Sequence, residues 1–527
     1  MNRTQPFEEL TRTREELEAL LARITTQVSP QDYQIIEASI RGVGQLLELI
    51  KKGPMSMRKL RLIVFGPKTE KTSRVCPGTQ PVVQEKPKRK GHGRTKAKSY
   101  TGARWEKVPH PDLKAGDPCP ECLKGKVRAQ KTPAVVLRIT GSPPISASGY
   151  EMERLRCDTC GMVFTAPVPG EAGTEKYDPS VGVTVALLRY GSGMPHYRLA
   201  ALQKSLGVPM PASTQWEVTK PLSAQAEPIW KAIIGCAANA HLIHQDDTPM
   251  RILDLRRPGA GAADPIDPKR KGTFTTNLLA HVGTHRVALY FTGWRHAGEN
   301  LAQLLEQRAA GLEPPIQMCD ALSRNMSLEF ETILAHCLSH GRREFVSVAQ
   351  NFPEECRHVL ESLGKVYHED ARTRELQLSP EERLVHHQTH SGPVMETLRA
   401  WMRDQIDGKR VEPNSGLGSA IGYMLKHWTP LTLFLRKAGA PLDNNICEQG
   451  LKRAILHRKN SLSYKTLNGA RTGDLFMSLI HTCRLNEVNA FDYLMAIARN
   501  GDAVAAAPES WLPWNYPKTA PPTADTR

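Results

Sequence analysis

The chain has 527 residues, a formal net charge of +16, 40% hydrophobic residues and eleven cysteines. This length exceeds one ordinary core, so about three or four domains are expected. No run approaches the roughly 18 apolar residues of a membrane span, and the N-terminus lacks the apolar stretch of a signal peptide, which argues against membrane and secreted classes. The odd cysteine count predicts reduced or metal-bound thiols rather than a disulfide framework. We therefore expect a soluble, cytoplasmic protein.

Residues 1–52 are expected to form a helical, zipper-like segment with two helices separated at Ser29-Pro30. In the second helix the apolar residues follow the alternating four-and-three spacing of a coiled-coil seam, at Ile36, Ile40, Val43, Leu47 and Ile50. Fewer than about three clean heptads per helix leave two interpretations open, packing within the chain and a dimerisation zipper.

Residues 53–115 are expected to form a basic arm that is partly disordered until it meets a partner. Residues 51–110 hold 17 Lys/Arg and 3 Asp/Glu, a net charge of +14, so the rest of the chain contributes only +2. A block of this kind indicates nucleic acid rather than a membrane, because no apolar anchoring face accompanies it. A flexible solubilising linker is the alternative. The cations expected to contact DNA here are Lys86, Lys88, Arg89, Lys90 and Arg94.

Two Cys-x-x-Cys pairs predict a zinc-ribbon-like module over residues 116–170. The first pair is Cys119 and Cys122, and the second, after 34 intervening residues, is Cys157 and Cys160. Four thiolates in two such pairs suit a tetrahedral zinc ion, and four protein ligands leave no open position, so the zinc would be structural. Four free thiols are the alternative.

Residues 171–235 are expected to be helical. A helix over 197–206, a turn at Gly207-Val208-Pro209 and a short helix from about Ser213 would suit a helix-turn-helix. Ordinary helix packing is an equally good interpretation of the same pattern.

The apolar pattern changes to that of strands after Ala240, and we expect a catalytic core over 236–460. Strands are expected at 241–247, 274–282, 286–292 and 315–319, with a helix near 300–310 before the last. A charged helical insertion is expected over about 326–438, a C-terminal helical segment over 461–500 and a disordered tail over 501–527.

Three acids stand at the points where such a core places chemistry: Asp246 ends the first strand, Asp320 follows the fourth, and Glu448 lies on a helix that an Asp/Asn cap opens. An RNase H-like sheet sets its first and fourth strands side by side, and a helix packs across to bring the third acid. Carboxylates this close repel one another unless cations neutralise them. Two magnesium ions would do so, and would serve phosphodiester transfer. Each acid alone is equally compatible with a turn or a cap.

Cations surround these acids in the sequence. Four follow Glu448 on its helix and are expected to take DNA phosphates: Lys452, Arg453, Arg458 and Lys459. Arg342 and Arg343 are expected to contact phosphates or to brace the acids. Cys337 and His340 share one helical face, but two ligands alone do not make a metal site.

Several motifs together resemble the IS66 family of bacterial insertion-sequence transposases. They are Phe65 to Lys71, the cysteine pairs, His244 to Pro249, Cys337 to Phe345, and Leu442 through Glu448 to Asn460. The resemblance covers most of the chain. It implies an α/β multidomain protein with an RNase H-like, retroviral-integrase-like core that carries a large helical insertion, preceded by the helical, basic and zinc-ribbon segments.

The resemblance also implies a function. Asp246, Asp320 and Glu448 would be the DDE triad of a polynucleotidyl transferase that uses two magnesium ions. It would cleave double-stranded DNA at the element's terminal inverted repeats and join the ends to target DNA. A homo-oligomer on DNA, small accessory proteins of the same element and association with the bacterial nucleoid are also expected.

Three questions stay open at this point. The family usually has Glu at the position of Asp247. Asp247 would be the ligand in place of Asp246 if the strand slipped by one residue, because adjacent residues point to opposite faces. A structure-selective nuclease on the same fold, and a non-catalytic DNA-binding protein such as a repressor or decayed element product, are the two rival functions.

Overall fold

The computed structural model describes residues 70–76, 107–122, 124–130, 135, 139, 143–156, 158, 160, 162–256, 270, 272–326 and 329–516. The expected zipper-like helices lie outside these residues, as do Cys157 and the five cations named in the basic arm. The chain divides into two units: Met1–Gln80 with Arg343–Glu361, and Pro81–Arg342 with Ser362–Arg527. No helix in the described parts of the chain is long and apolar enough to cross a membrane.

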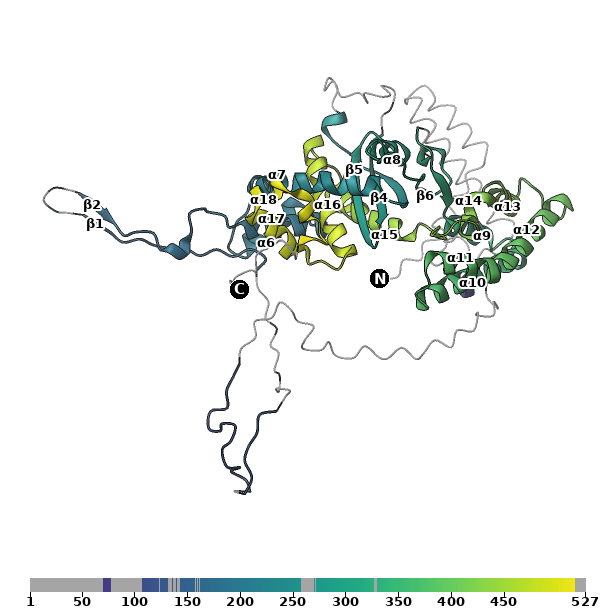
Figure 1. The fold of residues 1–527 in the computed structure, drawn as a ribbon. Coiled ribbons are helices and arrows are strands. Elements are labelled where there is room, and N and C mark those ends of the chain that lie inside the picture. Colours follow the sequence, from purple (N-terminus) through teal and green to yellow (C-terminus); the bar gives the residue numbers. More distant parts are fainter. Residues whose placement is uncertain are drawn as a thin grey trace, which may run out of the picture. The chain divides into compact units, whose positions relative to one another are not determined.

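A five-stranded mixed sheet organises the larger unit (Figure 1). Its strand order is β5-β4-β3-β6-β7. The central strand β3 pairs antiparallel with β4 and parallel with β6, and β7 continues the parallel side. The strands span Leu242–Pro249 (β3), Phe274–Val282 (β4), His285–Gly293 (β5), Ile316–Cys319 (β6) and Ile333–His336 (β7).

The structure confirms all four strands expected from the sequence and the contact between the first and the fourth. The hairpin from β4 to β5 turns through Gly283, whose φ of 57° is the left-handed region that a two-residue turn of this kind requires. The fifth strand, β7, lies inside the range expected for the helical insertion. It is as short as β6 and ends just before α9 (Leu338–Val348), so its apolar residues are equally compatible with the start of that helix.

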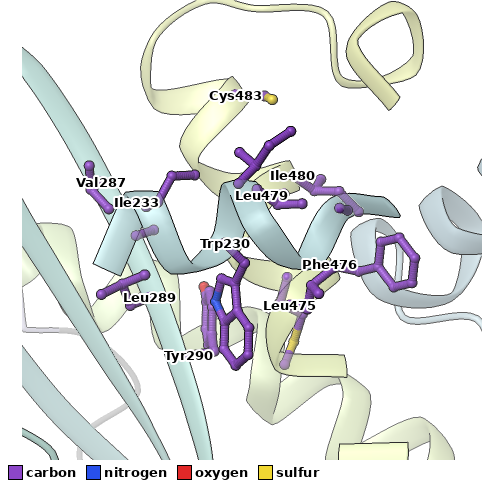
Figure 2. Packing of buried hydrophobic residues seen from close by; sticks show 14 of the residues in the cluster. Trp230, Ile233, Val287, Leu289, Tyr290, Leu475, Phe476, Leu479, Ile480 and Cys483 are labelled. Carbon is purple, nitrogen blue, oxygen red and sulfur yellow. The ribbon is translucent and has the colours of Figure 1, made fainter. Parts of the chain in front are cut away.

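Helix α7 (Ala212–Ala238) and helix α16 (Leu467–Leu485) build the main core against β5. Figure 2 shows Trp230 and Ile233 of α7 among Val287 and Leu289 of β5 and the apolar side chains of α16, which are Leu475, Phe476, Leu479 and Ile480. The short second helix of the expected helix-turn-helix is therefore the start of a 27-residue core helix that follows α6 (His196–Ser205).

Side chains of α16 cover the free edge of β5. The outward N–H groups of every second strand residue donate to side chains that recur every fourth residue of the helix. The pairs are Arg286 with Asn486, Ala288 with Thr482, Tyr290 with Ser478, and Thr292 with Asp474. The repeats match because two strand residues advance about 6.6 Å and four helical residues about 6 Å. The helix thus takes the place of a sixth strand and closes an edge that would otherwise invite strand pairing.

The helices after β7 begin at Leu338 rather than near 326. Those of this region span Leu338–Val348 (α9), Pro353–Glu375 (α10), Pro380–His390 (α11), Gly392–Asp407 (α12), Gly416–Lys426 (α13) and Trp428–Leu431 (α14). Asp370 joins α10 to α11 because its buried carboxylate pairs with Arg374, Arg383 and His387. In the smaller unit, Arg343 pairs with Glu70 at 3.1 Å.

The C-terminal region is ordered further than the sequence suggested. Residues from 501 were expected to be a disordered tail, but α18 (Gly501–Ala506) and a 3₁₀ turn (Pro508–Trp511) follow α17 (Ala490–Arg499). Trp511 is 4% exposed, and its carbonyl accepts a hydrogen bond of 2.7 Å from the Tyr493 hydroxyl. The Pro/Ala-rich composition concealed this anchor. Residues 517–527 lie outside the described chain.

The wholly buried carboxylate of Asp474 makes a pH-dependent contribution to stability. Burial raises its pKa to about 7, although the N–H and hydroxyl of Thr292 both donate to it. The unfolded value is about 3.9, so between these two pH values the folded state binds more protons. The free energy of unfolding therefore falls as pH rises from about 4 to 7. We predict that Asp474→Asn, which accepts a bond without titrating, removes this part of the decline in urea unfolding measured across that range.

The control is Asp474→Ala, which deprives the Thr292 N–H of its acceptor. It should destabilise the protein by about 1–3 kcal/mol at every pH. Parallel pH curves for wild type and Asp474→Asn would contradict the assignment.

Candidate active site

The register of two parallel strands brings the first two acids to one level of the sheet. His244 of β3 stands opposite Met318 of β6, so Asp246 and Asp320, each two residues further on, reach the same edge. Within β3, Asp246 therefore points to the same face as His244. Asp320 follows the last residue of β6, and its carboxylate accepts hydrogen bonds from the Asn325 amide and, at 3.3 Å, from the Leu322 N–H.

Helix α15 (Asn445–Ser461) carries Glu448 in its first turn and is bound to three neighbouring strands. The Asn444 side chain, just before the helix, donates to the Gln245 carbonyl of β3 at 2.8 Å and makes no helix-capping bond. Asn277 of β4 donates to the Cys447 carbonyl at 3.1 Å. The remaining contact, to β5, joins the Tyr290 hydroxyl to the Gly450 carbonyl at 2.8 Å.

The third contact requires a glycine. A Cβ at Gly450 would lie 2.4 Å from the Asn277 side-chain nitrogen and 2.8 Å from a ring carbon of His481. The helix therefore approaches the sheet as closely as its backbone permits, and this depth sets where Glu448 stands.

The charges of neighbouring acids act on Asp246. The pKa of Asp246 is raised to about 7, mainly by burial, and the negative charges of Asp320, Asp247 and Glu448 raise it further. The Asp247 N–H, which donates to Asp246 at 2.8 Å, opposes the rise. The fold thus brings Asp246, Asp320 and Glu448 into one electrostatic group. A buried carboxylate whose charged form is disfavoured by burial and by neighbouring acids fits a hard divalent cation, for which carboxylate oxygens are the preferred ligands.

Asp247 faces the other way and has partners of its own. Its side chain is 1% exposed and lies 3.0 Å from the His296 ring nitrogen and 3.3 Å from the Arg324 guanidinium. The Ala297 N–H at the start of helix α8 (Ala297–Leu305) also approaches it at 3.4 Å. These contacts attach the end of β3 to α8, so the two adjacent acids serve different surroundings.

The four cations of α15 divide into two pairs. Lys452 and Lys459 are exposed. Arg453 is half-buried beside Tyr290 and Arg484, and burial lowers its pKa. Arg458 donates to the Thr248 hydroxyl at 2.8 Å and to the Pro249 carbonyl at 2.7 Å, which fixes the end of β3. The two arginines thus have structural contacts, while the two lysines are open to a phosphate backbone. Arg342 is partly buried, and Arg343 forms the ion pair with Glu70.

Residues 175–472 match the model of the Transposase IS66 family, a span that holds all three acids and α15. The chain belongs to the IS66 transposase family. This confirms the resemblance noted in its motifs.

Three relatives come from Sinorhizobium fredii (strain NBRC 101917 / NGR234). Uncharacterized protein y4jD is 26% identical over 385 residues, 69% of this chain and 71% of the relative. Uncharacterized protein y4hP is 25% identical over 393 residues, with 70% and 68% covered. Uncharacterized protein y4qI is 23% identical over 349 residues, with 63% and 61% covered. Their names assign no activity.

This IS66-family member also carries a group that sequence reasoning missed. The ligand atoms of Cys337, His340 and Glu448 all lie within 4.8 Å of one another, and the group excludes Asp246 and Asp320. The Cys-x-x-His spacing was visible in the sequence, but its third member is more than 100 residues away and carried no local signal. Only the docking of α15 reveals it.

The first cysteine pair of the expected zinc module adopts a tight loop. The Cys119 N–H donates to the Gly125 carbonyl at 2.7 Å. Hydrogen bonds from the backbone of Gly125 and Lys124, and then from the Cys119 thiol, lower the pKa of Cys122. Donors aimed at a sulfur favour its thiolate, the form that binds metal. Cys160 is exposed, and Cys157 lies outside the described residues.

We predict that Gly450→Ala destabilises the protein by about 1–3 kcal/mol, because its methyl group would force α15 away from Asn277 and His481. The matched control is Gly422→Ala, on helix α13, where a Cβ would meet nothing within 4 Å. That change should raise the free energy of unfolding by up to about 1 kcal/mol, because alanine has a higher helix propensity than glycine. Urea unfolding of both variants measures whether each change lowers or raises the free energy of unfolding. Equal effects would refute the close approach of α15 to the sheet.

Proposed function

We propose that this transposase cleaves DNA at the ends of its insertion sequence and joins the 3′-hydroxyls to target DNA, with Asp246, Asp320 and Glu448 as its catalytic acids. The observation that carries the proposal is the electrostatic group these acids form within the region matched by the family model. An ordinary turn former or helix cap would gain nothing from two other acids beside it.

The sheet supports an RNase H-like core for the same chain. Its order, β5-β4-β3-β6-β7, sets the first strand of the sheet in the centre, beside the second and the fourth. The third strand, β5, stands at the outer end of the antiparallel side. That arrangement is the one under which acids on the first and fourth strands meet.

The same acids fit two magnesium ions. Bound there, magnesium would activate the attacking oxygen and stabilise the leaving one. The protein's own residues hold the acids in place: the Asp247 N–H orients Asp246, and Asn325 orients Asp320. Asn444 fixes the start of the helix that presents Glu448.

DNA contacts in this proposal come from several segments. Lys452 and Lys459 are exposed on the helix of Glu448, within reach of a phosphate backbone that enters the site. The basic arm and a structural zinc ion at Cys119, Cys122, Cys157 and Cys160 would recognise the terminal inverted repeats. The proposal also includes a homo-oligomer on DNA, with small accessory proteins of the same element.

The test is cleavage and strand transfer on labelled DNA that carries the element's own ends, with magnesium present. We predict that Asp246→Asn, Asp320→Asn and Glu448→Gln each lower the rate of joining by at least about 100-fold. Loss of a residue that only supports a metal ligand costs about 10-fold to 100-fold in activity, and loss of the ligand itself should cost more. Binding of the ends should persist. Asp247→Asn is the matched control, because it removes an adjacent buried charge that faces His296 and Arg324, and it should keep most of the activity.

The rival functions give other results. Cutting without joining would favour a structure-selective nuclease. A wild-type protein that binds the ends but never cuts, even with accessory proteins added, would favour a repressor or decayed element product. Loss of activity in Asp247→Asn but not in Asp246→Asn would move the first ligand by one residue.

A further inference from the structure

Glu448 faces two different sets of side chains. On one side it shares the electrostatic group of Asp246 and Asp320. On the other, one of its carboxylate oxygens lies 3.8 Å from His340 Nδ1, within the group of ligand atoms that also includes Cys337 Sγ. The Glu448 side chain is 21% exposed, so it is not sealed between the two sets.

The other two ligands are set in place by the backbone. Cys337 directly follows β7, and its N–H donates to the Cys319 carbonyl at 3.0 Å. Its sulfur accepts a hydrogen bond of 3.2 Å from the Asn444 N–H, at the start of α15. His340 follows in the first turn after it, with its N–H donating to the Cys337 carbonyl at 3.1 Å. Thiol and imidazole therefore meet Glu448 without a change of fold.

The chemistry of this group differs from that of the three acids. One thiolate, one imidazole and one carboxylate suit zinc and similar cations, whereas magnesium prefers oxygen ligands alone. Ligand atoms about 2.0–2.3 Å from a zinc ion stand roughly 3–4 Å apart. A spread of 4.8 Å therefore closes with small side-chain rotations. Three protein ligands leave the fourth position open.

We propose that Cys337, His340 and Glu448 form a site for a zinc-class divalent cation, and that this cation takes Glu448 away from Asp246 and Asp320. The regulatory consequence rests on the proposed role of Glu448 in catalysis. When the ion binds, the Cys337 thiol gives its proton to solvent, and no other bond forms or breaks. Such a cation would oppose magnesium-dependent joining by capturing a shared ligand, a form of inhibition that excess magnesium relieves.

Cobalt(II) is the probe for the site, because a cobalt–thiolate bond absorbs light in a way that oxygen and nitrogen ligands do not reproduce. The experiment titrates full-length protein and compares wild type with Cys337→Ser and with Cys236→Ser, a cysteine of α7 outside the group. The zinc module contributes equally to all three. We predict that Cys337→Ser alone loses one cobalt–thiolate signal, and that His340→Gln weakens it by about 10-fold to 100-fold.

Strand transfer at fixed magnesium supplies the second reading. Added zinc should inhibit the wild type at a concentration at least about 10-fold lower than it inhibits Cys337→Ser. An unchanged cobalt signal in Cys337→Ser, with unfolding midpoints equal to wild type, would overturn the site. A cobalt signal that depends on Cys337 in a protein that never joins DNA would keep the site and remove the transposition mechanism. DNA joining by a protein that lacks this cobalt signal would keep the transposition mechanism and remove the site.

Discussion

The Asn444 side chain is the contact on which the rest of the site depends. Its amide donates to the Gln245 carbonyl at 2.8 Å, and its oxygen lies 3.0 Å from a His244 ring nitrogen. These groups are about 200 residues apart in the chain, and Asn444 is 1% exposed. Because Gln245 adjoins Asp246 and Asn444 stands one turn before Glu448, this side chain links the segments that carry two of the acids. Few other side chains offer a donor and an acceptor at this length.

Acids gathered in this way oppose folding, and the surrounding structure offsets that cost. The raised pKa of Asp246 means that its ionised form is disfavoured where it stands. The helix that presents Glu448 is held by β3, β4 and β5 together, and β5 is in turn held along its outer edge by α16. A strained charge arrangement thus rests on the most extensively bonded part of the sheet, which is where a rigid site belongs.

Sequence patterns gave the strands but not all of their surroundings. Strand β4 was expected at the residues where it lies, because its nine residues are rich in strand-forming Phe, Thr and Val and a two-residue hairpin turn ends it. Strand β7 was missed because its short apolar run ends just before α9 and is equally compatible with a helix start. The anchor at Trp511 was hidden in a Pro/Ala-rich segment. The three acids could be named because each lies near the end or the start of an expected element and because the motifs around Asp246 and Glu448 resemble those of the family. The contacts of Asp247 could not, because His296 and Arg324 are distant in sequence.

Distance in the sequence also explains why the Cys-x-x-His pair looked incomplete, because its third member, Glu448, gives no local signal. Asn444 is the residue that brings the three together. The backbone N–H of Asn444 donates to Cys337, while its side chain bonds β3. The residue that brings Glu448 to Asp246 therefore also brings it to Cys337 and, through the first turn of α9, to His340. No substitution at Asn444 can separate the two neighbourhoods of Glu448. Separation has to come from Cys337 or His340, the two members of the metal group besides Glu448.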